Sequence, residues 1–115
     1  MTIRQKQLTD TVWQVQVHGR LDHSQTPQLN DTLLALIEAE KYHLVIDLSE
    51  VSYINSGGLR CLVSVWRKTR AHKGDVVLLG LNERLSEIFT MIGFDRVFQI
   101  VPNQQEALSM LATSN

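Results

Sequence analysis

The sequence predicts a single α/β domain built on a mixed, mostly parallel sheet of about five strands with about four helices. Two strand-like segments come first with no helix between them, and helix-like and strand-like segments then alternate to the end of the chain. Parallel strands need a long crossover, usually a helix, so this alternation indicates parallel pairing after an antiparallel start. With 115 residues, 43% of them hydrophobic, the chain can form one core, and we treat residues 1–115 as one domain.

The first two strands form the predicted hairpin. Residues 11–17 place Trp13, Val15 and Val17 on one face and glutamines on the other, which is typical of a half-buried strand. A weaker strand is expected at residues 3–8, and it turns near Thr9.

Apolar spacing and capping residues predict the first three helices. Thr26 is expected to be the N-cap of the first helix, with Pro27 at its first position. A second helix is expected over about residues 57–72. The third is expected to be capped by Asn82 and stopped by Gly93.

Three short apolar runs predict the remaining strands, at residues 44–48, 76–79 and 97–101. Such runs are typical of strands buried on both faces, although the pattern does not decide whether helices cover one face of the sheet or both. Asn103 and Glu106 form a capping pair for a final helix.

Composition excludes several classes of function. The net charge of −1, without a long run of Lys or Arg, gives no footprint for nucleic acid, and no apolar stretch approaches the roughly 18 residues of a membrane span. The chain carries one cysteine, Cys61, and four scattered histidines, so neither a disulfide framework nor a metal site is expected. No glycine-rich phosphate loop is present, and no cofactor is expected. We expect a cytoplasmic protein that is a monomer or a weak dimer.

Residues 47–62 join a buried strand to a helix, and loops at the carboxyl ends of strands are common binding sites in α/β sheets. Ser56 falls where the helix N-cap is expected. Gly57 and Gly58 follow it, although each glycine inside a helix costs about 1 kcal/mol. A helix N-terminus also accommodates a phosphate. From the residues alone, Ser56 is either a plain cap or an exposed phosphate acceptor, and both interpretations stay open.

Two motifs carry a resemblance to a known family. The segment Val51-x-Tyr53-Ile54-x-Ser56-x-Gly58-Leu59-Arg60 resembles the signature loop of STAS domains in bacterial anti-sigma factor antagonists. Gly19-Arg20-Leu21-Asp22 resembles the family's second landmark, which lies at the end of a strand before the first helix. The resemblance covers essentially the whole chain.

The resemblance implies a partner-switching function and no enzymatic activity. Such proteins bind an anti-sigma factor that is also a serine kinase, and this binding frees the sigma factor. The kinase holds ATP and magnesium in its own site and phosphorylates the loop serine, after which the complex separates and a phosphatase resets the antagonist. By position, Ser56 is the implied phosphate acceptor.

The implied partner surface consists of Asp22, Asn55, Ser56, Gly57, Gly58 and Arg60. Two of these depart from the best-known members, which have an aspartate before the serine and a second serine after it, where this chain has Asn55 and Gly57. For Asp22, a local turn role and a loop-ordering role near Ser56 both stay open.

The predicted second helix carries two apolar stripes. Leu59, Leu62, Val63 and Trp66 are expected to face the core, and Cys61 and Val65 form a second, flanking stripe. Two stripes indicate either packing on two neighbours or a docking surface beside Ser56 with Arg60, Arg67 and Lys68 at its rim. Two other functions remain as alternatives to the switch. One is an unmodified STAS adaptor in a signalling scaffold or a lipid-transport complex, and the other is a small α/β enzyme, for which no nucleophile and base pair is visible.

Overall fold

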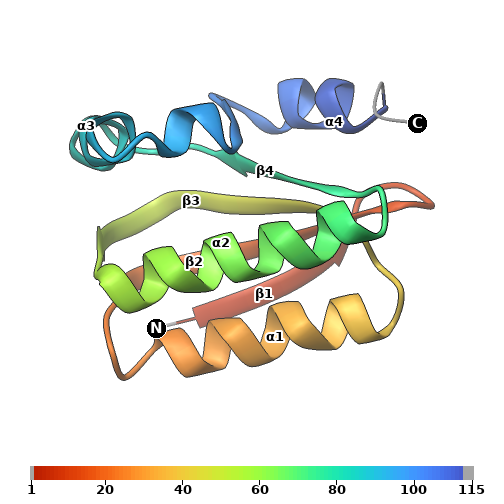
Figure 1. Cartoon of the computed structure of the whole chain (residues 1–115), viewed down its shortest axis with the longest axis horizontal. Helices are drawn as coiled ribbons and strands as arrows, with labels where there is room; N and C mark the ends of the chain where they lie inside the picture. The colour runs from red at the N-terminus through yellow and green to blue at the C-terminus, as the bar shows by residue number, and fades with distance from the viewer. Residues whose placement is uncertain (1, 113–115) are drawn as a thin grey trace.

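The computed structural model describes residues 2–112, which form a five-stranded sheet with four α-helices and one short 3-10 helix (Figure 1). The strands are β1 (Thr2–Gln7), β2 (Val12–Leu21), β3 (His43–Ile54), β4 (Asp75–Leu79) and β5 (Gln99–Val101). The helices are α1 (Thr26–Glu38), α2 (Ser56–Ala71), α3 (Glu83–Met91), the 3-10 helix η1 (Phe94–Arg96) and α4 (Gln104–Ala112). The predicted α/β class and element order are confirmed.

The strands lie in the sheet in the same order as in the sequence, β1-β2-β3-β4-β5. β1 and β2 form the predicted antiparallel hairpin, and the other three neighbouring pairs are parallel. The sheet is therefore mixed and mostly parallel, as the single helices between strands predicted.

Helices cover both faces of the sheet, which the sequence pattern had left open. Successive residues of a strand point to opposite faces. Leu44 and Ile46 of β3 pack in the cluster that contains the buried residues of α1, α2 and α3. Val45, between them, packs in a second cluster with Ala107 and Leu111 of α4. Figure 1 shows α1 and α2 side by side across the sheet.

Three strands differ from their predicted limits by two residues or more. β2 does not end at residue 17 but continues to Leu21. β3 does not end at residue 48 but continues to Ile54, because β2 keeps pairing with it as far as Leu21 across two shifts of register. β5 starts at Gln99 rather than at residue 97. The 3-10 helix η1 precedes β5 at residues 94–96. It follows directly after Gly93, whose φ of +81° ends α3 as predicted.

Two of the predicted helix N-caps are confirmed. The side chains of Asn82 and Asn103 accept hydrogen bonds from the backbone N–H groups three residues on, at 2.8 and 2.9 Å. The prediction for Thr26 was wrong, because Gln25 is the N-cap of α1 and Thr26 is already helical. The Thr26 hydroxyl donates instead to the carbonyl oxygen of Asp22, at 2.9 Å.

Candidate functional site

The two sequence motifs meet at the carboxyl ends of β2 and β3. Leu21 is in register with Ile54, and the backbone N–H of Asn55 donates to the carbonyl oxygen of Leu21 at 3.0 Å. The guanidinium of Arg20 lies 4.2 Å from the ring centroid of Tyr53, at cation–π distance. These contacts hold the segment before α2 against the end of β2.

Asn55 is the N-cap of α2, so the prediction that Ser56 caps this helix was wrong. The Oδ1 atom of Asn55 accepts a hydrogen bond from the backbone N–H of Gly58 at 2.9 Å. Asn55 has extended backbone geometry, with ψ near 180°, which is the conformation that an N-cap adopts. Ser56 comes one residue later and is the first residue of the helix.

Ser56 has an exposed side chain at the N-terminal end of α2. In an α-helix, the N–H groups of the first turn have no intrahelical acceptor, and the helix dipole favours negative charge there. Asn55 takes one of these N–H groups, that of Gly58. The position is therefore both reachable and electrostatically suited to an added anionic group.

The two glycines after Ser56 have different surroundings. Gly58 is buried, and a Cβ atom on it would lie 2.7 Å from Cγ1 of Ile54 and 3.6 Å from Cβ of Leu21. Packing of α2 on β2 and β3 thus explains the absence of a side chain at Gly58. Gly57 is half-buried, and a Cβ atom on it would lie 3.3 Å from Oδ1 of Asn55 and 4.0 Å from Nη2 of Arg60, so it would be crowded less than a Cβ atom on Gly58.

Asp22 closes a tight turn directly after β2. Its Oδ1 atom accepts hydrogen bonds from the Ser24 hydroxyl at 2.7 Å and from the Ser24 backbone N–H at 3.1 Å. The Ser24 hydroxyl bond is the main reason that the pKa of Asp22 lies below its ordinary value. The local turn interpretation of Asp22 is confirmed, and the turn lies at the same end of the sheet as Asn55, through the neighbouring Leu21.

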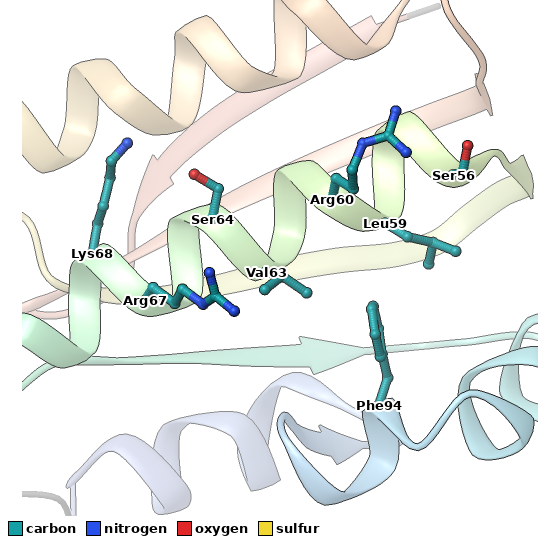
Figure 2. Close-up of a pocket in the computed structure, with 8 residues that line it drawn as sticks. All are labelled: Ser56, Leu59, Arg60, Val63, Ser64, Arg67, Lys68 and Phe94. Atoms are coloured by element: carbon teal, nitrogen blue, oxygen red, sulfur yellow. The ribbon is translucent and has the colours of Figure 1, made fainter.

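The side of α2 beside Ser56 borders a groove of about 630 Å³ (Figure 2). We call it the α2–η1 groove, because its lining comes from one face of α2 and from Phe94 of η1. The residues that line it are Ser56, Leu59, Arg60, Val63, Ser64, Arg67, Lys68 and Phe94.

The lining side chains of α2 form two rows at i, i+4 spacing. Figure 2 shows Leu59, Val63 and Arg67 on the side of α2 that faces Phe94. The other row starts at Ser56 and continues along the helix with Arg60, Ser64 and Lys68. Ser56 therefore lies at the end of a polar, basic row, and the row beside it is apolar at Leu59 and Val63 and ends in Arg67.

The second apolar stripe of α2 is explained by packing. Cys61 and Val65 are buried, and Sγ of Cys61 lies 3.5 Å from Oδ1 of Asn30 in α1. Burial raises the pKa of the Cys61 thiol to about 11, so the thiol is protonated at neutral pH. Leu59 and Val63 of the first stripe were expected to face the core, but they are only partly buried against it and also line the groove.

The sequence pattern did not predict that Phe94 lines a groove beside Ser56. In the sequence it lies between the expected end of a helix and an expected strand. Its ring packs edge-on against Phe89 and contacts Phe98, so core aromatics hold it in place.

No three His, Cys, Asp or Glu side chains within residues 2–112 are grouped so that they could hold a metal ion. Over the same range, no helix has the length and apolar character that crossing a bilayer requires.

Comparison with known proteins identifies the family of the chain. The model of the STAS domain family matches residues 4–107. The chain therefore belongs to the STAS domain family, as the two motifs indicated.

Sequence identity to individual relatives identifies the group within the STAS family to which the chain belongs. The anti-sigma-B factor antagonist of Listeria monocytogenes is 33% identical over 84 residues, which is 73% of this chain and 74% of the relative. Within the STAS family, the chain belongs with the anti-sigma factor antagonists.

Solved structures show the same fold. An anti-sigma factor antagonist of Mycobacterium paratuberculosis superposes with a TM-score of 0.84 at 24% identity, over 96% of this chain and 93% of that chain. The Bacillus cell fate determinant SpoIIAA, in its phosphorylated form, gives a TM-score of 0.77 at 17% identity, over 95% of this chain and 98% of that chain.

Proposed function

We propose that this protein is a non-enzymatic anti-sigma factor antagonist that is switched by phosphorylation of Ser56. Its partner is an anti-sigma factor with serine kinase activity, and binding of the unphosphorylated antagonist frees the sigma factor. The kinase supplies ATP and magnesium from its own site. Phosphorylated antagonist dissociates, and a phosphatase returns it to the binding state.

The observation that carries the proposal is the exposed Ser56 side chain at the first position of α2. Because Asn55 supplies the cap, the Ser56 hydroxyl is not committed to holding the helix start. A kinase can therefore modify this hydroxyl without breaking the helix N-cap. The proteins with which the chain groups act as anti-sigma factor antagonists, and SpoIIAA, which shares its fold, exists in a phosphorylated form.

A phosphate on Ser56 changes charge far more than structure. It adds about −1.5 to −2 charges and three acceptor oxygens. The first turn of α2 stabilises that charge through its free N–H groups and the helix dipole. Arg60 lies one turn further along the same row, and a Cβ atom on Gly57 would be only 4.0 Å from its Nη2 atom, so its guanidinium reaches back toward the helix start.

In the complex with the partner, by contrast, the phosphate on Ser56 is destabilising. Binding would enclose the phosphate against a surface that is fitted to a neutral hydroxyl, and burying a charge without a new counter-charge is costly. We propose that Asp22, Asn55, Gly57 and Arg60 lie in this contact surface around Ser56. Gly58 is buried, and its contribution is to let α2 pack closely on β2 and β3.

The first test is direct modification. The partner is co-purified from the native cell with tagged antagonist, incubated with it and ATP–Mg²⁺, and the antagonist is analysed by mass spectrometry. We expect one added phosphate on a peptide containing Ser56 and none on Ser56→Ala. Absence of phosphate from wild-type protein, in a complex that forms normally, would favour the unmodified adaptor, for which Asn55 and Gly57 are the motivating departures from the family loop.

A further inference from the structure

We infer that the α2–η1 groove binds an acidic amphipathic helix of the partner protein. The apolar side of that helix would pack on Leu59, Val63 and Phe94, and its carboxylates would face the basic residues of α2. The inference rests on the proposed function, because it takes the occupant to belong to the partner that contacts Ser56. It names the chemistry by which that partner is recognised.

The floor of the groove is apolar and the adjoining chain adds more exposed apolar surface. Leu59 and Val63 are partly buried, and Phe94 faces them from η1. Within three residues of Phe94, the side chains of Met91, Ile92 and Val97 are also exposed. Large apolar side chains that gather on a surface commonly mark a protein contact.

The charge of the groove has one sign. Arg60, Arg67 and Lys68 line it, and no acidic residue is among the lining residues of the described chain. The ion pairs found within residues 2–112 involve other groups, so these three cations have no carboxylate partner in the fold. The whole chain carries a net charge of −1, so the positive charge of the groove does not follow from an overall basic composition. Complementarity therefore calls for an acidic partner segment.

The shape of the groove fits a helix. From Ser56 to Lys68 the lining of α2 extends about 18 Å at the rise of an α-helix, which is the length of about 12 helical residues. The two rows at i, i+4 spacing match the side-chain spacing of a second helix laid along α2, with its apolar face down.

Phosphorylation acts on the same row. Ser56 is the first residue of the row that continues with Arg60, Ser64 and Lys68. A phosphate there repels an acidic segment and, one turn away, attracts the guanidinium of Arg60 for itself. The proposed occupant thus explains the direction of the switch, since a negative charge at the end of a basic row weakens the binding of an acidic helix.

The test uses the full chain labelled with ¹⁵N and a synthetic amphipathic helix of about 14 residues, with Leu on one face and Glu on both flanks. We expect shifted amide signals on α2 from Ser56 to Lys68 and at Phe94. A control peptide with Lys in place of Glu should leave these signals unchanged. Equal effects from both peptides, or shifts confined to other surfaces, would overturn the inference.

The partner itself provides the second arm. The double variant Arg67→Glu/Lys68→Glu reverses two groove charges, whereas Arg4→Glu/Lys6→Glu makes the same charge change at exposed positions of β1. With the co-purified partner we expect the groove variant to bind about tenfold more weakly and the β1 variant to bind as wild type.

The two proposals fail in distinguishable ways. If the groove variant binds as wild type, the groove inference is wrong even when phosphorylation of Ser56 still releases the partner. If the groove variant binds weakly but phosphorylated wild-type protein binds well, the docking groove stands and the phosphorylation switch is wrong.

Discussion

The Oδ1 atom of Asn55 accepts the backbone N–H of Gly58 at 2.9 Å, which makes Asn55, and not the neighbouring Ser56, the residue that caps α2. In the proposed function, this contact assigns helix capping and phosphorylation to two different residues of the loop. The cap is supplied by a residue that needs no modification, and the exposed Ser56 is left available beside it.

Stability measurements distinguish these two roles. Asn55→Ala removes the cap and should lower the free energy of unfolding by about 1 kcal/mol. Ser56→Ala removes an exposed hydroxyl and should change it by less than about 0.5 kcal/mol. Urea denaturation of the two variants checks the difference, and a larger loss for Ser56→Ala than for Asn55→Ala would return the cap to Ser56.

Substitution of the two glycines of α2 by alanine should lower the free energy of unfolding by different amounts. Gly58→Ala places a Cβ atom 2.7 Å from Cγ1 of Ile54, so we expect a loss of about 1–3 kcal/mol from overpacking. Gly57→Ala should cost less, because its crowding against Asn55 Oδ1 at 3.3 Å is offset by a gain in helix propensity of up to about 1 kcal/mol.

A double-mutant cycle identifies the contact that makes Gly58 necessary. In an Ile54→Ala background, which removes the crowding atoms, Gly58→Ala should destabilise the protein less than it does in wild type. Strictly additive losses, measured by urea denaturation, would show that Ile54 is not the cause.

The Asp22 turn gives a prediction for low pH. Hydrogen bonds from Ser24 hold the pKa of Asp22 below its ordinary value of 3.8, so the ionised form is favoured in the folded protein. The resulting stabilisation is present above pH 3.8 and is lost as the pH falls through the folded pKa. In Ser24→Ala, NMR titration of the Asp22 carboxyl should show its pKa moving up toward the ordinary value. An unchanged pKa would mean that the backbone bonds alone cause the shift.

Arg60 should hold the phosphate in the free antagonist. Phosphorylation of Ser56 places a dianion one helical turn from the guanidinium, and such i, i+4 pairs contribute about 0.2–0.5 kcal/mol. Phosphorylated wild-type protein should therefore melt at or above the temperature of the unmodified protein, and Arg60→Gln should reduce the difference. Thermal melts of the four species measure this, and a phosphorylated protein that melts well below the unmodified one would contradict the stabilising helix N-terminus.

The sequence predicted the fold well because the signals were strong where elements are buried. Asn82 and Asn103 cap the starts of helices and Gly93 ends one, as expected. The apolar runs marked the central strands. The second half of β3 was missed because its residues 49, 50, 52 and 53 are exposed and it pairs there with β2, so no apolar run marks it.

The site was predicted less completely, for two physical reasons. Asn and Ser are both good N-caps, so the sequence cannot decide between adjacent residues when either side chain can reach an N–H group. The α2–η1 groove also depends on Phe94, which is distant from α2 in sequence and is positioned by contacts with Phe89 and Phe98. Arg60, Arg67 and Lys68 were visible as a rim, but the surface opposite them was not.

The most direct measurement is the affinity of the co-purified anti-sigma partner for unmodified antagonist and for antagonist phosphorylated at Ser56, by titration calorimetry in the same buffer. A loss of about 3 kcal/mol corresponds to binding roughly a hundredfold weaker, and we expect at least this loss for the phosphorylated protein. Ser56→Asp, which carries less charge, should bind poorly, and Ser56→Ala should bind as well as wild type and resist release by ATP. Equal affinity for the unmodified and the phosphorylated protein would contradict the switch.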